Sequence, residues 1–189
     1  MDGNHGTGGG SASLHERLAA IAKKVTLARN EDIPAQECEC LYILTEGILR
    51  VWLLDPQGND ITDSFVWRPW QVVSTAPRVL PRMEGIAETV TALVPSQVLV
   101  IPVEAARSLC AEDPAFAREY LDYIRSMYLA LWEHKSVLMT LDAAARYRWF
   151  LERYPGMIGR VKHKLIASFL GMTPVSLSRI RGKLRREEE

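Results

Sequence analysis

Residues 164–180 decide the fold of this chain, and they read KLIASFLGMTPVSLSRI. The apolar spacing in residues 162–170 predicts an amphipathic helix of about three turns. Gly171 can adopt the positive φ that ends a helix, while Thr173 and Pro174 supply an N-cap and a first-turn proline for a second helix. Because Ala167 is small, it lets the two helices approach closely. The stretch therefore predicts a helix-turn-helix.

The second predicted helix, residues 174–184, has two faces. The inner face carries Leu177, Leu184 and either Ile180 or Arg181; the outer face carries Val175, Ser178, Arg179, Gly182 and Arg186. Residues 142–186 contain eleven Lys or Arg and two acids, whereas residues 1–141 contain twelve Lys or Arg and eighteen acids. A basic segment attached to an acidic body favours contact with a polyanion, and such motifs place their second helix in the DNA major groove. We expect DNA binding; the alternative is a solvated helical surface.

A long helix is predicted upstream of this motif. Asp113 and Pro114 are a helix start, and the chain then continues to about Thr140 without Gly or Pro. Apolar side chains recur along about 26 residues, or about 39 Å at 1.5 Å per residue. They are Phe116, Tyr120, Tyr123, Met127, Leu131 (or Ala130), His134, Leu138 and Leu141. So long a stripe needs a partner of equal length, so we predict a dimer seam; the alternative is packing against its own domain.

Residues 33–103 alternate short apolar runs with turns. Strands are predicted over residues 40–44, 48–54, 61–67, 88–94 and 98–101, followed by a short helix over 102–110. This spacing favours an antiparallel, jelly-roll-like β-roll. The predicted fold class is therefore α+β: a β-roll, a long dimerisation helix and a C-terminal helix-turn-helix domain.

The composition excludes several classes of protein. The 189 residues are 48% apolar and 24% charged, as in ordinary globular chains. No apolar run approaches the roughly 18 to 20 residues of a membrane span. Residues 1–13 hold five glycines and no signal-peptide pattern, so we expect a flexible arm and a cytoplasmic protein. Three cysteines suit a reducing compartment better than a disulfide framework.

Residues 164–180 resemble the helix-turn-helix of the Crp/Fnr family of bacterial transcription regulators. Residues 41–52, LYILTEGILRVW, resemble the second and third strands of that family's cyclic-nucleotide-binding-like β-roll. The resemblance covers about residues 33–186 and implies a homodimer on a twofold-symmetric operator; we also expect RNA polymerase as a partner. The predicted divisions are an arm (1–13), the roll (14–112), the dimerisation helix (113–141) and the DNA-binding domain (142–189). Any wing is expected between Tyr154 and Val161.

The resemblance also implies which residues contact DNA. Pro174, Val175 and Arg179 fall where the family's base-reading side chains sit. Arg179 suits a bidentate contact to guanine, with a phosphate contact as the alternative; Val175 replaces the family's usual acidic residue and suits a thymine methyl. Hydroxyls and lysines suit the phosphate backbone. The predicted DNA-contacting set is Lys162, Lys164, Thr173, Pro174, Val175, Ser176, Ser178, Arg179 and Lys183.

The effector site is less clearly marked. Family members that bind cyclic nucleotides carry a Gly-Glu segment and then an Arg followed by Ser or Thr. The corresponding residues 70–76 and 81–85 lack the Gly-Glu pair, and Met83 follows Arg82, so we do not expect a cyclic nucleotide. An iron–sulfur cluster needs about four cysteines, and Cys38, Cys40 and Cys110 are too few. The candidate effector residues are Trp67, Trp70 and Arg82; the tryptophans fill the roll's core in the alternative interpretation.

No catalytic constellation, phosphate loop or metal-ligand spacing stands out, so we expect neither an enzyme nor a cofactor. One alternative within regulation is a repressor or activator that needs no effector. An alternative from another class is a small-ligand-binding or cupin-like enzyme with a helical dimerisation tail. A cupin-type metal site needs clustered His and Glu on the strands, and no His lies between His15 and His134.

Overall fold

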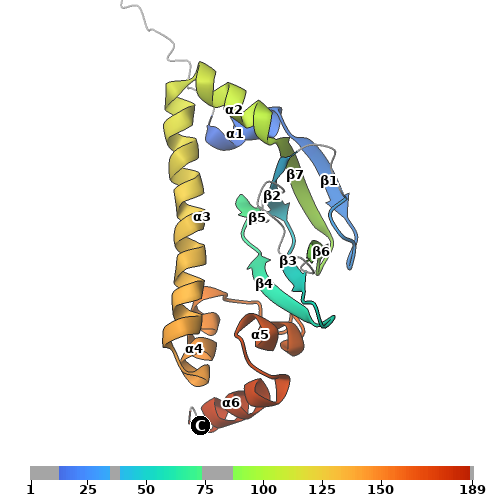
Figure 1. Cartoon of the computed structure of the whole chain (residues 1–189), viewed down its shortest axis with the longest axis vertical. Coiled ribbons are helices and arrows are strands. Elements are labelled where there is room, and N and C mark those ends of the chain that lie inside the picture. Colours follow the sequence, from blue (N-terminus) through green and yellow to red (C-terminus); the bar gives the residue numbers. More distant parts are fainter. Residues whose placement is uncertain (1–12, 35–38, 74–86, 188–189) are drawn as a thin grey trace, which may run out of the picture.

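The structure is a computed structural model that describes residues 13–34, 39–73 and 87–187. Within these ranges the chain forms a β-roll, a long helix beside it and a cluster of three helices at one end (Figure 1). The α+β class expected from the sequence is confirmed. Cys38, Arg82 and residues 1–12 of the expected arm lie outside the described residues.

Seven antiparallel strands build the roll as two sheets. One sheet has the order β1-β7-β2-β5 and the other the order β4-β3-β6. The strands are β1 (Lys23–Leu27), β2 (Cys40–Glu46), β3 (Leu49–Leu54), β4 (Asp60–Val66), β5 (Gln71–Val73), β6 (Ala87–Ala92) and β7 (Ser96–Pro102). Five of them match strands predicted from the sequence. The short β1 and β5 were not predicted, because neither has a long alternating pattern.

The roll is held by a core between its two sheets. Leu44 and Val98 from the first sheet pack with Leu49 and Val66 from the second, all of them buried. Gly47 connects β2 to β3 with a φ of +108°, and a Cβ at this position would collide with Ser96. The turn therefore requires glycine both for its backbone conformation and for the space it leaves.

Six helices complete the fold of the described residues. They are α1 (Leu14–Ala20), α2 (Val103–Glu112), α3 (Pro114–Thr140), α4 (Ala143–Arg153), α5 (His163–Phe169) and α6 (Pro174–Glu187). The caps follow the sequence signals: the Asp113 carboxylate accepts from the backbone N–H of Ala115 and Phe116, and Pro114 occupies the first turn of α3. Only α1 was not predicted; Ser13 and Glu16 cap it reciprocally.

The face of α3 predicted as a dimer seam faces inward, which corrects that prediction. Phe116 is fully buried, and Tyr120, Tyr123 and Met127 pack with it against α1, α2 and the roll. His134 stacks on Phe169 of α5 with ring centroids 4.0 Å apart. The stripe thus packs against the same chain's roll and helices, as in the alternative interpretation that α3 packs against its own domain. We call Phe116, Tyr120, Tyr123, Met127 and His134 the inner stripe.

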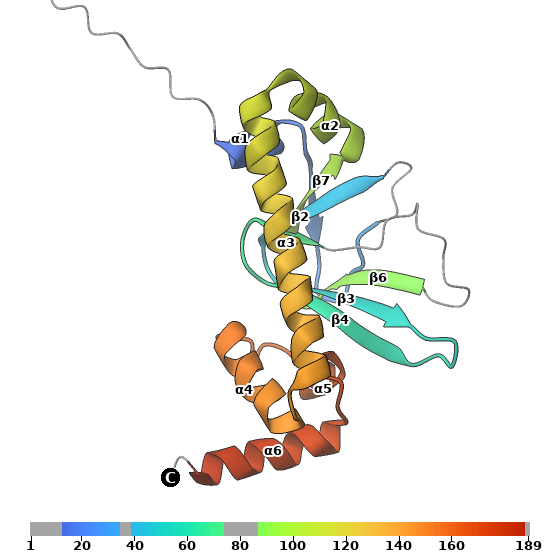
Figure 2. The same cartoon turned by 60° about the vertical axis from the view of Figure 1, so that its left-hand side comes forward.

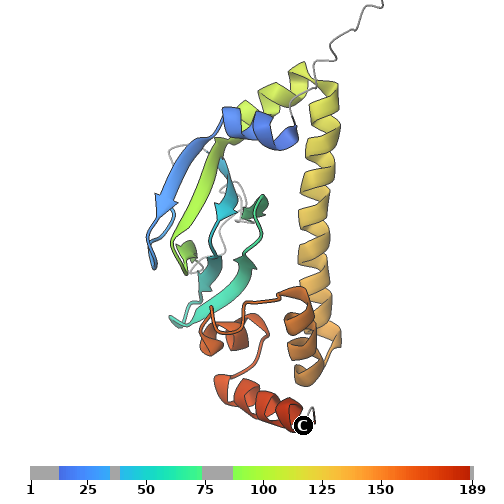
Figure 3. The same ribbon diagram turned by 180° about the vertical axis from the view of Figure 1, so that it is seen from behind.

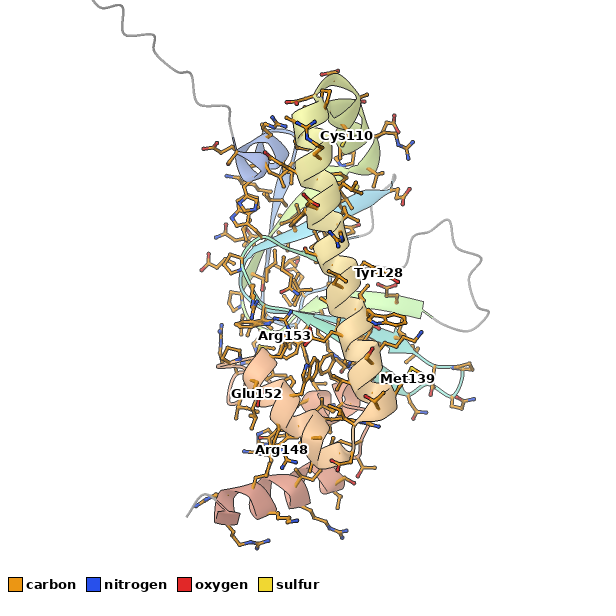
Figure 4. The ribbon with its side chains drawn as sticks, turned by 90° about the vertical axis from the view of Figure 1, so that its left-hand side faces the viewer. Cys110, Tyr128, Met139, Arg148, Glu152 and Arg153 are labelled. Carbon is orange, nitrogen blue, oxygen red and sulfur yellow. The ribbon has the colours of Figure 1, made fainter. Side chains whose placement is uncertain are left out.

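A second stripe of large side chains lies on the opposite, solvent-facing side of α3. It comprises Leu121, Arg125, Tyr128, Trp132, Lys135 and Met139, which follow one another at spacings of 4, 3, 4, 3 and 4 residues. The exposed fractions are 67% for Leu121, 62% for Tyr128, 55% for Trp132 and 73% for Met139. Figure 4 views this side of α3, where Tyr128 and Met139 project with no other part of the described chain in front of them. We call it the outer stripe.

The segment where a wing was expected is a compact turn. Residues 154–161 contain one isolated bridge, between Ile158 and Val161, and no hairpin. Gly156 and Gly159 have positive φ values of 77° and 89°, which turn the chain before a strand can form. Met157, fully buried, fixes the turn to the helical core.

Candidate DNA interface and the adjoining junction

Helices α5 and α6 form the helix-turn-helix predicted from residues 164–180. Gly171 has a φ of +62°, and Met172 N–H donates to the Ala167 carbonyl at 3.0 Å, which closes the C-terminus of α5. The Thr173 hydroxyl accepts from the Ser176 N–H at 3.1 Å and thereby caps α6. The predicted cap, turn glycine and first-turn proline are all confirmed.

Helix α6 presents its predicted outer face to solvent. Val175 is 60% exposed, whereas Leu177 on the opposite face is 1% exposed and packs in the core of the helical cluster. The remaining residues predicted on the outer face are exposed as well: Ser178, Arg179, Gly182 and Arg186. Figures 1 and 2 show α6 lying across the end of the molecule, with none of the described chain beyond it. Its outer face is therefore free to approach a large ligand.

The other predicted contact residues flank this face. Lys162 and Lys164 are exposed at the start of α5, and Thr173 and Pro174 are exposed at the start of α6. The Thr173 and Ser176 hydroxyls lie 2.9 Å apart, so they engage each other as well as the helix backbone. Lys183 is exposed on the third turn of α6. All nine predicted residues thus belong to α5, α6 or their caps.

Arg181 has a contact that the sequence did not indicate. Its guanidinium lies 2.7 Å and 2.6 Å from the two ring nitrogens of His163 at the start of α5. The inner face of α6 was predicted to use either Ile180 or Arg181; Ile180 packs against the core, and Arg181 is half-buried. The contact between Arg181 and His163 joins the two helices at their solvent edge.

Arg146 of α4 positions the motif and was missed in the sequence. Its guanidinium donates to the carbonyls of Leu138 at 2.8 Å, Leu141 at 2.9 Å and Leu170 at 3.1 Å. The first two carbonyls end α3, and the third ends α5. One planar donor thus satisfies free carbonyls at two helix ends. In the sequence, Arg146 is marked only by its position one turn after Asp142, the residue that caps α4.

A shared aromatic core joins the helical cluster to the roll. Phe65 of β4 lies 5.2 Å from Phe169 and 6.5 Å from Phe150, measured between ring centroids. The Thr62 N–H of β4 donates to the Ser168 hydroxyl of α5 at 2.8 Å. Figure 3 shows α5 directly beneath the β4 end of the roll. The first helix of the motif is therefore fixed to the β-roll.

Two titratable groups are buried at this junction. Burial raises the pKa of the Asp63 carboxyl above its usual range. Burial lowers the pKa of His134, although its Nε2 lies 3.1 Å from the Phe169 carbonyl oxygen. His134 is consequently a neutral imidazole near pH 7, and it acts as an aromatic surface between Phe169 and Trp149.

The candidate effector tryptophans line a pocket at the same junction. Trp67 and Trp70 follow β4 and border this pocket, together with residues of α3, α4 and α5. Trp70 adopts a φ of +65°, stacks on His15 at 4.1 Å and accepts at its carbonyl from the Tyr123 hydroxyl. Trp52 lies apart, on β3, where its indole N–H donates to Thr91. The structure thus brings together two of the three candidates; Arg82 is the one outside the described residues.

The described ranges contain neither a cluster of metal-ligating side chains nor a helix suited to span a membrane. No three His, Cys, Asp or Glu side chains of residues 13–34, 39–73 and 87–187 gather as they would around a metal ion. In the same ranges no helix combines the length and apolarity that crossing a bilayer requires. Cys40 and Cys110, the two described cysteines, are both half-buried.

No protein-family model and no curated protein matches the chain. Solved structures do match. FixK2 from Bradyrhizobium japonicum superposes with a TM-score of 0.70 at 17% identity, covering 89% of this chain and 86% of that one. A cyclic nucleotide-binding domain containing protein from Listeria monocytogenes superposes with a TM-score of 0.70 at 16% identity, covering 89% and 84%. A protein from Eubacterium rectale assigned to the Crp/Fnr transcriptional regulators has a TM-score of 0.64 at 15% identity, covering 92% and 83%.

These similarities define the class of fold. The chain has the fold of Crp/Fnr regulators, with the cyclic-nucleotide-binding-like roll, the long helix and the helix-turn-helix in the same order. The fold expected from the sequence resemblance is confirmed over about nine-tenths of the chain.

Proposed function

We propose that this chain is a sequence-specific DNA-binding transcription regulator. The observation that carries the proposal is the outer face of α6: a capped helix at the end of the molecule exposes Val175, Ser178 and Arg179 while Leu177 anchors it from within. Its segment carries eleven basic residues and two acidic ones. Such a helix fits the major groove, where Arg179 would read guanine and Val175 would contact a thymine methyl.

The proposed regulator acts as a homodimer through the outer stripe of α3. This stripe exposes four large apolar side chains in heptad spacing, and burying them requires a second helix of similar length. Two copies of α3 packed about a twofold axis that runs parallel to the helices would place two copies of α6 at the same end of the dimer. The operator would then be twofold symmetric, with half-site centres about one helical turn apart.

The other parts of the proposal follow from this role. A regulator of this kind works in the cytoplasm, contacts RNA polymerase and catalyses no reaction. The phosphate contacts would come from Lys162, Lys164 and Lys183, together with the hydroxyls of Thr173, Ser176 and Ser178. Pro174 would set the approach of the helix to the first base pair.

The proposal is tested on a duplex recovered from the source genome by the full-length protein. Arg179→Ala should weaken binding to that duplex by about 1–3 kcal/mol and relax one base position. Arg107→Ala is the matched control, because Arg107 is an exposed arginine of α2 that pairs with Glu104, far in sequence from α6. Fluorescence anisotropy at about 0.15 M salt measures both affinities, since at low salt nonspecific phosphate contacts dominate. Equal affinities for the two variants would contradict the placement of the recognition helix.

A further inference from the structure

A pocket of about 360 Å³ lies at the junction of the roll and the helical cluster. Its walls come from the segment that joins β4 to β5, from the inner side of α3, and from α4 and α5. Arg153 lies at the end of α4 nearest the roll, where Figure 4 labels it. A molecule in this pocket would therefore touch the roll, α3, α4 and the end of α5 at once.

Eight of the twenty residues that line the pocket carry aromatic rings. Trp67 lies 6.2 Å from Tyr154, and Trp149 lies 5.7 Å from Tyr154, measured between ring centroids. Phe169 and Trp149 stack nearly parallel at 6.2 Å. Rings in this arrangement offer faces and edges to a flat ligand rather than to a branched one. A cavity of about 150 Å³ holds benzene, so the pocket has room for two fused rings and a substituent.

The charge at the pocket favours an anion. Arg68, Arg153 and Glu133 are the ionised side chains that line it, and His134 is neutral because burial lowers its pKa. Glu133 is occupied: its two oxygens accept from the Trp149 indole at 2.9 Å and from Arg153 Nε at 3.2 Å. The Arg68 guanidinium lies 4.9 Å from the centre of the Trp67 ring, exposed at the rim. Among the described residues, no carboxylate lies within ion-pair distance of Arg68, which stands next to an aromatic wall.

We propose that this pocket binds a small planar aromatic anion, with its rings against the wall formed by Trp67, Tyr154 and Trp149 and its acidic group on Arg68. Charge-assisted hydrogen bonds between a guanidinium and a carboxylate are stronger than neutral ones and are often bidentate. Because the ligand bridges β4–β5 and α4, it holds the helix-turn-helix in one orientation relative to the roll. The inference that the bound anion regulates the helix-turn-helix rests on the proposed function, whereas the inference that the pocket binds the anion does not.

The test uses the full-length protein and 2-naphthoate as the probe. Isothermal titration calorimetry should show 2-naphthoate binding at least about tenfold more tightly than 2-naphthamide, its uncharged counterpart, and than the saturated decahydro-2-naphthoate. Arg68→Gln should remove the preference for the acid over the amide. The control Arg107→Gln, at an exposed arginine of α2, should leave it unchanged. Ala130→Trp should abolish binding, since Ala130 lines the pocket from an exposed helical position where a larger side chain leaves the fold intact.

Three results would overturn the assignment. The first is no binding of 2-naphthoate up to about 1 mM, a concentration that corresponds to a binding free energy of only about −4.1 kcal/mol. The second is equal affinity for the acid and the amide. The third is an Arg68→Gln protein that still prefers the acid. Retention of genomic DNA is measured separately, without the probe. If the protein binds the probe as predicted but retains no DNA, the proposed function fails and the binding site stands. If DNA is retained but 2-naphthoate does not bind, the reverse holds.

Discussion

Replacing Trp132 with alanine should separate the proposed homodimer into monomers. Trp132 is 55% exposed in the single chain, at the centre of the outer stripe, with Tyr128 one turn before it. Lys135 Nζ lies 5.2 Å from the centre of the Trp132 ring and covers one side of it. The exposed part of the Trp132 ring is a large apolar surface that α3 can bury against a second copy.

The size of the effect follows from that exposed fraction. Aromatic side chains bury about 150–250 Å² each, so the exposed 55% of Trp132 is about 80–140 Å². At about 25 cal/mol per Å², this area contributes about 2–3.5 kcal/mol per copy, as an upper estimate. Two copies meet in each dimer, and the alanine Cβ retains part of the contact. We therefore expect a loss of about 3 kcal/mol per dimer, which is at least a hundredfold in dissociation constant.

Sedimentation equilibrium over a range of protein concentrations measures this constant. Ile61→Ala is the matched control, because Ile61 is a large apolar side chain of β4 that is 42% exposed outside the outer stripe. The control should dimerise like the unsubstituted protein. The reasoning is refuted if Trp132→Ala and Ile61→Ala have the same dissociation constant, or if the unsubstituted protein is a monomer at about 100 μM.

Three further predictions concern the stability of the helical cluster. Thr173→Ala should lower the free energy of unfolding by about 1 kcal/mol, because the hydroxyl caps α6, while Thr173→Ser should retain most of it; urea titration measures both. Gly171→Ala should lower it by about 1–2 kcal/mol, since its φ is +62° and the new Cβ would lie 3.3 Å from Arg146; an unchanged melting temperature would contradict this. Burial lowers the pKa of His134 below its unfolded value of about 6.5, so its contribution to the free energy of unfolding is complete above about pH 6.5 and is lost as the pH falls below that value. His134→Phe should therefore flatten the pH dependence of the free energy of unfolding, measured between about pH 7.5 and about pH 5.5.

The order of the elements and the helix-turn-helix were predictable because their signals are local. Asp113 with Pro114, and Thr173 with Pro174, mark helix starts through hydrogen bonds made within one turn. Gly171 marks the end of α5 through its own backbone conformation. The outer face of α6 followed from its period once these limits were known. Such features depend on neighbours in the sequence, so the sequence alone specifies them.

The two faces of α3 were assigned incorrectly because both carry large side chains at heptad spacing. Phe116 and Tyr123 contact the body of the chain, whereas Tyr128 and Trp132 face solvent, and no difference in composition separates the pairs. Which face is covered depends on contacts with α1, α2 and the roll, elements distant in sequence. Arg146 was missed for the same reason, because its acceptors Leu138 and Leu170 come from two other helices. The junction pocket likewise forms only when four separate segments meet.

The most direct test of the central claim is selection of genomic fragments by the purified full-length protein at about 0.15 M salt, followed by sequencing of the retained DNA. A homodimer that reads DNA with two copies of α6 should enrich a twofold-symmetric motif whose half-site centres lie about one helical turn apart. The same selection with Arg179→Ala should lose the base preference at one position of each half-site. If the unsubstituted protein enriches no sequence beyond what this variant retains, α6 does not read DNA.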